Sequence, residues 1–396
     1  MISGGPVDAL ASDAATLRAW NELAEQALSP NPFHRPEVVL AAARHLPPAA
    51  AASVVTVTAD GRMDLAVPFV PGQRLPRLPG RASTVLDHDQ SLLGTPLARE
   101  ASPDLWRAAL DGLSAHSPDR WMVMPLIDIS IAEVVKEASA ARGRKAAILA
   151  PRARAFTRRR PEADYLESQI SNRSLRGLRQ DRRRLAEELG GDVSVVDFLA
   201  RDGVRDAVSR FIEREAAGWK GETGGALASH PEQERFFRET CHALAQRGCL
   251  AVYGLEGADG TVAAVAVDFV DGDGWFTVKT AYDEDLGKRS PGRLLEQDAF
   301  RLFHASGRTF MDTCASPHNA GQHRLFGGER QLTTVYVSLD GVRGDLMVVL
   351  ALRVQQAQHA WRDLRRWWRR EGRDLARRYV DDRRTQIRRI FSGKTS

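Results

Sequence analysis

The sequence predicts an α/β (α+β) protein with two tandem domains. Each is expected to hold a mixed, mostly antiparallel sheet flanked by helices, and a basic amphipathic helix follows at the C-terminus. Three observations lead to this fold class. The 396 residues suffice for two or three domains. Helically spaced apolar stretches alternate with short extended runs. The second half orders these elements as a meander of strands framed by helices, and the first half shows a looser version of that order.

In the first half, apolar spacing predicts helices and apolar/polar alternation predicts strands. The expected helices cover residues 14–27, 37–46, 105–116 and 129–142. The expected strands cover 53–58, 63–70 and 121–127, and residues 145–156 begin extended. Ala59-Asp60-Gly61 separates the first two strands and predicts a hairpin between them.

In the second half, a long charged helix is expected over residues 162–189, and further helices over 201–217 and 231–247. The expected strands cover 193–198, 250–256, 262–270, 275–282, 309–314 and 331–339, and a short helix is expected at 319–325. The character of the chain changes near Arg158-Arg159-Arg160-Pro161. We therefore divide it into an N-terminal domain (1–157), a C-terminal domain (158–345) and a basic helix (346–396).

Composition narrows the class of protein. The formal net charge is +5, and the cations gather at residues 142–184 and at the C-terminus. The three cysteines have no framework spacing, which is typical of a reducing compartment. The first 15 residues do not form a signal-peptide pattern, and no run approaches the length that spans a bilayer. The ten histidines show no metal-site spacing. We expect a cytoplasmic protein without a metal.

The segment from Tyr282 to Phe300 predicts an anion site. A strand ends at Tyr282, and a helix begins after Lys288-Arg289-Ser290-Pro291-Gly292. A helix start offers unpaired N–H groups and partial positive charge, and a glycine lets a ligand approach the backbone. Ser290 is expected to cap the helix, and Pro291 suits its first turn. The alternative is an ordinary capped helix without a ligand.

Three antiparallel strands followed by such a turn, a helix and another strand resemble the core of the GNAT acyltransferase superfamily. The chain is most similar to the branch with CelD-type cellulose-biosynthesis proteins and FemAB-like transferases. The residues that carry this resemblance span most of 15–340. They are Asn31-Pro32-Phe33, Gly94-Thr95-Pro96-Leu97, Arg176 to Leu185 with Gly190, Trp219-Lys220-Gly221 with Thr223-Gly224, Tyr282-Asp283-Glu284 and Ser290-Pro291-Gly292-x-Leu294-Leu295.

The resemblance implies that the turn binds the pyrophosphate of acetyl-CoA or another acyl-CoA. The implied cofactor-binding residues are Lys288, Arg289, Ser290, Gly292 and Arg293. The usual superfamily pattern, Arg/Gln-x-x-Gly-x-Gly/Ala, is replaced here by Lys288-x-x-Pro291-Gly292. FemAB-like relatives use aminoacyl-tRNA instead of acyl-CoA, so both donors stay open.

Acyl transfer needs a base for the acceptor's proton and donors for the oxyanion. Asp283, at the end of the third strand, and His318, after the next strand, are the candidate bases, and Tyr282 is a candidate donor to the leaving thiolate. Each has an ordinary alternative: an acidic turn residue, a solvated histidine and a packed tyrosine.

Trp219-Lys220, beside a glycine-rich loop, and Asp312, on the strand that would border the cleft, are candidate substrate-binding residues. A tryptophan that closes the core is the alternative for Trp219. Cys314 is expected to be a small buried residue rather than a nucleophile, because no cationic neighbour is evident in the sequence.

The last helical run, residues 352–391, has Trp361, Leu364, Trp368 and Leu375 near one face and arginines on the others. This pattern is typical of a helix at a membrane interface, and equally of a helix that packs on the domain or on a second subunit.

These observations and the resemblance predict a GNAT-type N-acyltransferase, acetyl being the first choice of acyl group. The acceptor would be an amine or hydroxyl of a small-molecule, lipid-linked or nucleotide-linked sugar precursor of the envelope or of a polysaccharide. One alternative is a FemAB-like transferase, in which residues 173–184 would contact tRNA. No nucleic acid is expected as a partner otherwise. The other is a binding module that kept the fold without the chemistry.

Overall fold

The computed structural model describes residues 1–78, 80–164, 168–315 and 325–368. Within these residues, fourteen strands form a single sheet. The strands are β1 (Ile2–Pro6), β2 (Ser53–Ala59), β3 (Arg62–Gln73), β4 (Ala82–Val85), β5 (Leu97–Ala98), β6 (Trp121–Asp128), β7 (Ala146–Ile148), β8 (Arg152–Arg158), β9 (Val193–Asp197), β10 (Leu250–Gly257), β11 (Val262–Asp271), β12 (Gly274–Tyr282), β13 (Phe310–Asp312) and β14 (Gly328–Ser338).

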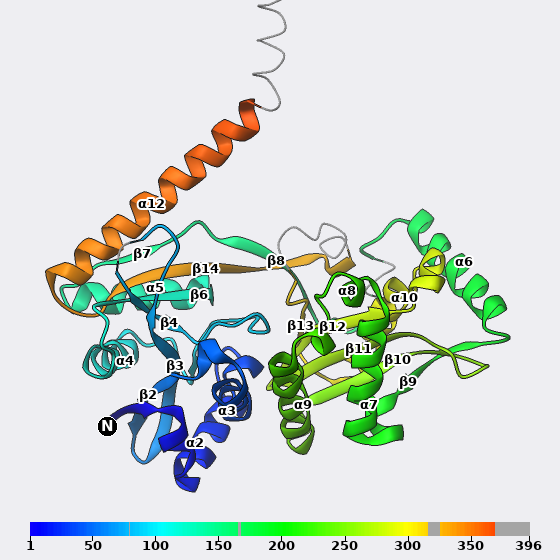
Figure 1. Cartoon of the computed structure of the whole chain (residues 1–396), viewed down its shortest axis with the longest axis horizontal. Coiled ribbons are helices and arrows are strands. Elements are labelled where there is room, and N and C mark those ends of the chain that lie inside the picture. The colour runs from blue at the N-terminus through cyan, green and yellow to red at the C-terminus, as the bar shows by residue number, and fades with distance from the viewer. Residues whose placement is uncertain (79, 165–167, 316–324, 369–396) are drawn as a thin grey trace, which may run out of the picture.

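The helices flank this sheet on both faces (Figure 1). The α-helices are α1 (Val7–Ala11), α2 (Ala14–Glu25), α3 (Pro36–His45), α4 (Pro103–His116), α5 (Ile129–Ala141), α6 (Asn172–Glu188), α7 (Phe198–Ala217), α8 (Trp219–Glu222), α9 (Pro231–Gln246), α10 (Pro291–Ser306) and α12 (Gly341–Trp367). Short 3₁₀ helices are η1 (Pro32–His34), η2 (Pro47–Ala49), η3 (Leu227–Ser229) and η4 (Glu284–Arg289).

The sheet consists of two halves with the same connectivity. We call β1–β7 with α1–α5 the first half and β9–β13 with α6–α10 the second half. In the first half β1, β2, β3 and β4 pair antiparallel, and β6 then joins β4 in parallel after α4. In the second half β9, β10, β11 and β12 pair antiparallel, and β13 joins β12 in parallel after α10. The predicted tandem of mixed, mostly antiparallel units with flanking helices is confirmed.

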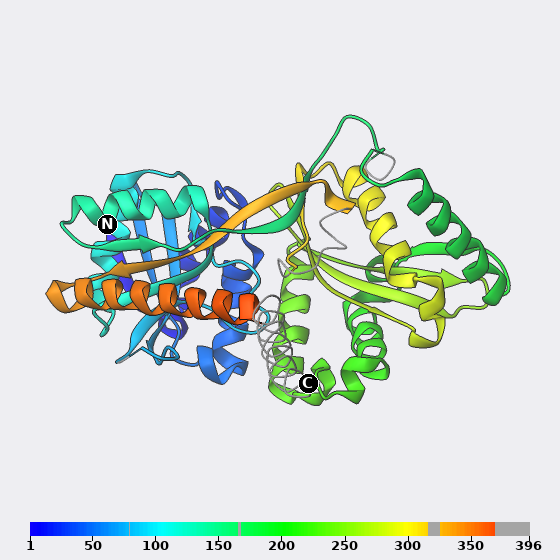
Figure 2. The same ribbon diagram turned by 90° about the horizontal axis from the view of Figure 1, so that it is seen from above.

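Two strands cross between the halves and join their sheets edge to edge. β8 leaves the first half and pairs antiparallel with β13 of the second. β14 pairs with β8 through its first residues and with β6 of the first half through its last residues. Figure 2 shows both strands running between the two halves. The two halves therefore share one backbone hydrogen-bond network.

One hydrophobic core also spans the junction. It contains Trp20 of α2 and Phe33 of η1 together with Phe211 of α7 and Phe237 of α9. A second core lies between α4, α5 and the other face of the first half, and a third lies between α6, α10 and the other face of the second half. Arg35 adds a buried ion pair across the junction, because its Nη1 lies 2.6 Å from Asp271 Oδ1.

Most predicted elements are present with boundaries shifted by a few residues, and two helices start elsewhere. α6 begins at Asn172 rather than 162, since the Ser171 side chain accepts the N–H of Ser174 and caps the helix there. α12 begins at Gly341 rather than 352. β1 and β4 were not predicted. The helix expected at 319–325 lies outside the described residues except for Leu325.

Candidate functional site

The start of α10 differs from the expected capped helix. Ser290 has φ 53° and ψ 45°, in the left-handed region, and its side chain makes no capping hydrogen bond. The expectation that Ser290 caps the helix is therefore wrong. Pro291 does occupy the first turn, as expected. A left-handed non-glycine residue costs free energy and is seen more often at functional sites than elsewhere.

The backbone groups at this helix start leave one donor for a ligand. Arg293 and Leu294 both donate their N–H groups to the carbonyl of Ser290, at 3.0 and 3.1 Å. Pro291 has no N–H. Among the described residues, the N–H of Gly292 is thus the donor that an anion could use here. This helix start therefore offers an anion fewer free backbone N–H donors than the glycine-rich pattern of the superfamily would.

The three predicted cations of the turn are placed differently. Arg293 lines a cavity beside the helix start. Arg289 instead points to α6, where its Nη2 lies 2.5 Å from Glu188 Oε1. Lys288 is exposed and does not line the cavity. The structure therefore brings Ser290, Gly292 and Arg293 together at the cavity and leaves Lys288 and Arg289 outside it.

This cavity, which we call the α10 cavity, has a volume of about 740 Å³. It lies between the sheet and α10, and runs from the helix start toward Ala299, about 13 Å along the helix at 1.5 Å per residue. It is lined by Ile170, Ser174, Tyr253, Ala266, Asp268, Thr277, Thr280, Tyr282, Gly287, Ser290, Pro291, Gly292, Arg293, Leu295, Glu296, Ala299 and Leu325.

A buried carboxylate, Asp268 of β11, lies on the sheet side of the α10 cavity. Its Oδ2 accepts hydrogen bonds from Tyr253 Oη (2.6 Å) and Trp275 Nε1 (2.7 Å). Its Oδ1 accepts the N–H of Val278 at 3.3 Å. Val278 lies where the β11–β12 register shifts, so Asp268 satisfies the N–H that this bulge releases from the ladder.

Asp268 differs from the other buried acids of the described chain in having no basic partner. Each of the others has an arginine or lysine within 4.0 Å; these are Asp64, Glu215, Asp271, Asp298 and Asp312. Burial raises the pKa of Asp268 to about 6. A perturbed acid in a cleft is a candidate functional group. Asp268 is not among the residues predicted from the sequence; the signal for it there is a single aspartate in an otherwise apolar strand (VAAVAVDFV).

The opposite face of β12 holds a second polar cluster around Glu215 of α7. Lys220 Nζ lies 2.9 Å and Lys279 Nζ 3.5 Å from Glu215 Oε1, and the N–H of Leu227 donates to Oε2. Burial opposes ionisation of Glu215, but these partners together lower its pKa. Burial also opposes ionisation of Lys279 and therefore lowers its pKa. Trp219, beside Lys220, is 54% exposed and does not close the core.

Tyr282 connects the two faces. It lines the α10 cavity and also the small hollow, about 30 Å³, that Trp219 and Lys220 share with Glu284. Burial and Glu284 raise the pKa of its phenol. The neighbouring Asp283 accepts from Arg214 Nη1 at 2.7 Å and caps η4 through the N–H of Asp285. The Asp283 carboxylate thus already accepts two hydrogen bonds.

The remaining predicted residues do not gather at the α10 cavity. Asp312 is fully buried, with Arg330 Nη1 2.9 Å from its Oδ2. Cys314 is buried, as expected for a packing residue; Arg154 and Arg330 do lie near it, contrary to the expected absence of cationic neighbours, but burial outweighs them and raises the pKa of its thiol well above the usual value. His318 lies outside the described residues, so its role as a base stays a prediction.

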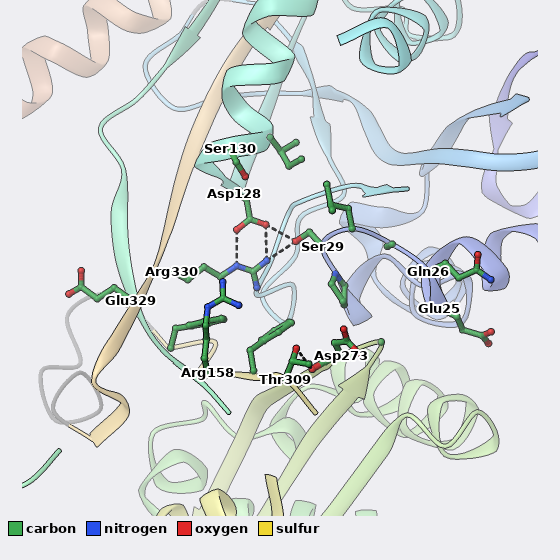
Figure 3. Close-up of a pocket in the computed structure, with 17 residues that line it drawn as sticks. Glu25, Gln26, Ser29, Asp128, Ser130, Arg158, Asp273, Thr309, Glu329 and Arg330 are labelled. Atoms are coloured by element: carbon green, nitrogen blue, oxygen red, sulfur yellow. Dashed lines mark hydrogen bonds and ion pairs between the residues drawn. The ribbon is translucent and has the colours of Figure 1, made fainter. Parts of the chain in front are cut away.

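A second cavity, of about 610 Å³, lies between the two halves (Figure 3). Arg330 of β14 forms one wall, donating to both Asp128 oxygens and to Ser29 Oγ at 2.7–2.9 Å. Phe156 and Phe310 stack with centroids 5.3 Å apart, and the Arg158 guanidinium lies 5.7 Å from the Phe156 ring. This wall contains residues from both halves and from the crossing strands β8 and β14. It therefore depends on these two strands pairing with strands of the opposite half.

Within the described ranges, no set of three histidine, cysteine or acidic side chains is arranged to bind a metal ion. In the same ranges, no helix has both the length and the apolar character needed to cross a bilayer.

Comparisons with known proteins support the fold. Residues 172–320 match the family model described as "Acetyltransferase (GNAT) domain". No curated protein sequence matches the chain significantly. Solved structures with a similar fold include FemX (11% identity, TM-score 0.57, 81% of this chain and 95% of that one). L-PGS from Bacillus licheniformis is similar over 85% and 95% of the two chains (14%, TM-score 0.52).

The C-terminal domain of a putative lysylphosphatidylglycerol synthetase from Agrobacterium fabrum gives a comparable match (13% identity, TM-score 0.51, 85% and 95% coverage). At such identities the likeness concerns the fold. The family match to residues 172–320 and the similarity of the whole chain to FemX agree with the GNAT/FemAB-like fold expected from the sequence. These matches do not confirm the resemblance to CelD-type proteins.

Proposed function

We propose that the chain is an acyltransferase whose donor lies in the α10 cavity, with its anionic part at Gly292 and Arg293 and its acyl end toward Asp268. The observation that carries this proposal is the cavity itself, which begins at a helix start and extends along α10 beside the bulge of β12. Its length and mixed polar lining suit an extended donor with one anionic end.

Acyl-CoA is the proposed donor, and acetyl the proposed acyl group. Gly292 and Arg293 fit a phosphate, one through its backbone N–H and the other through its guanidinium. Arg289 does not contribute while it is bound to Glu188. The proposed acceptor is an amine or hydroxyl of an envelope or polysaccharide precursor, a choice that rests on the family resemblance.

The proposed reaction is direct attack on the thioester. The acceptor's nitrogen or oxygen forms a bond to the acyl carbon, the carbon–sulfur bond breaks, and the thiolate takes a proton. Tyr282 remains the proposed proton donor to that thiolate; because it lies beside Gly292, at the anionic end of the proposed site, this role requires the donor to bend back toward the start of α10. Asp283 and His318 remain the proposed bases for the acceptor's proton, and Asp283 would have to exchange Arg214 for the substrate. Trp219, Lys220 and Asp312 remain proposed substrate-binding residues.

An aminoacyl donor is the second candidate, and one observation favours it. Asp268 is an acid at the cavity with no cationic partner among the described residues, and an ionised buried carboxylate is costly without one. The ammonium group of an aminoacyl moiety would supply that partner, whereas an acetyl group would not.

A thermal-shift screen tests the proposal, since a ligand that binds the folded state raises the melting temperature. The ligands are acetyl-CoA, coenzyme A, tRNA and a stable 3′-aminoacylamino-3′-deoxyadenosine 5′-phosphate. Stabilisation by acetyl-CoA and coenzyme A supports the first donor. Stabilisation by the adenosine compound, lost in Asp268→Asn and absent for its N-acetylated form, supports the second. No stabilisation by any of them would favour a binding module without this chemistry.

A further inference from the structure

Helix α12 packs on the protein over only part of its length. Its 27 residues correspond to about 40 Å at 1.5 Å per residue. Near its start, Val348 and Ala351 are buried in a cluster with Trp121 of β6 and Tyr336 of β14. Figure 1 shows the later turns extending beyond the sheet and away from both halves. The second part of α12 therefore presents its side chains outside the core of the molecule.

Large apolar side chains are exposed on this projecting part. Trp361 is 57% exposed and Leu364 52% exposed, and Trp368, four residues further, is 56% exposed. Spacings of three and four residues place all three on one helix face. Single exposed hydrophobic residues are common on soluble proteins, but a row of large ones marks an interaction surface. We call Trp361, Leu364 and Trp368 the α12 apolar face.

Cations surround the α12 apolar face. Arg343, Arg353, Arg362 and Arg365 are exposed on α12, against one exposed acid on its described part, Asp363. The Arg365 guanidinium lies 5.4 Å from the centre of the Trp361 ring. The 28 residues that follow Trp368 in the sequence contain nine arginines and Lys394, against four acidic residues. The apolar face thus lies at the beginning of a strongly cationic C-terminal sequence.

We propose that α12 binds the surface of an anionic lipid bilayer, with Trp361 and Leu364 inserted among the headgroups and the arginines in contact with lipid phosphates. Tryptophan favours the membrane–water interface, and arginine can extend from an apolar face toward charged headgroups. The combination of apolar and cationic side chains favours a lipid surface over RNA as the partner, because RNA would contact the cations but would not bind Leu364. The proposal concerns α12 alone and does not depend on the acyltransferase activity.

Co-sedimentation of the full chain with vesicles tests this proposal. The vesicles contain phosphatidylcholine with or without phosphatidylglycerol. The apolar variant is Trp361→Ala with Leu364→Ala, and the charge variant is Arg362→Gln with Arg365→Gln. The matched control is Trp219→Ala with Leu28→Ala, which removes a tryptophan and a leucine that are 54% and 57% exposed elsewhere. Circular dichroism confirms that each variant is folded.

The wild type and the control should bind the phosphatidylglycerol vesicles and not the neutral ones. The charge variant should lose about 25-fold in partitioning, since each cation near an anionic surface contributes about a fivefold factor. The apolar variant should lose about tenfold or more, and salt should weaken wild-type binding. Equal binding by all four proteins would overturn the proposal. So would sedimentation equilibrium showing a dimer that the apolar variant dissociates, without vesicle binding, because a second copy would then cover the face.

Discussion

The two halves of the molecule share a connectivity but differ where a helix follows the meander. In the first half, α4 begins at Pro103 and is capped by Ser102, whose side chain accepts the N–H of Leu105, and Trp106 is fully buried one turn later. In the second half, α10 begins at Pro291 after Ser290, which is in the left-handed region and makes no side-chain cap, and a cavity of about 740 Å³ remains between this helix and the sheet.

This difference shows how one topology can serve either packing or binding. The first-half core under α4 contains Leu65, Val67, Phe69 and Trp106, which fill the space between helix and sheet. Under α10, the sheet contributes Ala266, Asp268, Thr277 and Thr280 to the cavity wall, although Leu295 and Leu325 also line it. The fold therefore sets the place of the helix start, and side-chain volume decides whether a ligand can lie beside it.

The largest expected effect concerns the closed half. Trp106→Ala should lower the free energy of unfolding by about 3–5 kcal/mol, because it opens a cavity in a packed core. Urea denaturation followed by circular dichroism measures this loss.

The reverse change in the other half is Ala299→Leu, which puts volume into the α10 cavity. It should weaken donor binding about tenfold, and it should lower the free energy of unfolding less than Trp106→Ala does, because the added volume enters the cavity. Similar stability losses for both variants would contradict the comparison.

Asp268 of the second half and Asp128 of the first half should respond to pH with opposite sign. Burial raises the pKa of Asp268 to about 6, so the folded protein keeps a proton there that the unfolded chain releases. Its contribution to the free energy of unfolding should therefore fall by about 3 kcal/mol as pH rises from about 4 to above 6. Urea titrations across this range should show the fall in the wild type and not in Asp268→Asn.

Asp128 of the first half provides the matched control. Burial opposes its ionisation, but Arg330, Ser29 and Thr95 lower its pKa overall. Its contribution to stability should be complete above the unfolded pKa and should be lost as pH falls. In Asp128→Asn that acid-side loss should diminish. A pH dependence of the same sign for both aspartates would show that their environments are not as different as the structure indicates.

Gly292 should matter for donor binding more than Gly287, although both line the α10 cavity. A Cβ built at Gly292 lies 3.3 Å from Cδ1 of Tyr282, whereas one at Gly287 meets nothing within 4 Å. Gly292→Val should therefore displace Tyr282 and obstruct the backbone N–H, and weaken coenzyme A binding about tenfold or more. Isothermal titration calorimetry compares it with Gly287→Ala, for which affinity near that of the wild type is expected. Unchanged affinity in Gly292→Val would mean that the anion binds elsewhere.

The smallest expected effect compares the two serines at the helix starts. Ser102→Ala should lower the free energy of unfolding by about 1 kcal/mol, since it removes a side-chain cap. Ser290→Ala removes no cap and should change it by less than about 0.5 kcal/mol. Thermal or urea unfolding of the pair measures the difference, and equal losses would imply a capping role for Ser290 that its geometry does not show.

The order and type of most elements could be predicted from local patterns, because apolar periodicity reports which face of a helix or strand is buried. The sequence located the strand–turn–helix segment at 282–300, and the structure places Ser290, Gly292 and Arg293 of that segment at a cavity. It also identified the apolar spacing of Trp361, Leu364 and Trp368, since a helix repeats locally.

Which of these residues contact one another depends on the folded arrangement of the chain. Arg289 and Glu188 are 101 residues apart in the chain, and their ion pair removes a cation from the predicted site. Asp268 became a candidate because Tyr253, Trp275 and the bulge at Val278 enclose it without a basic side chain. The exchange of β8 and β14 likewise depends on strand pairing between distant segments. Local patterns cannot encode such contacts, since burial and partner choice arise only when the chain is folded.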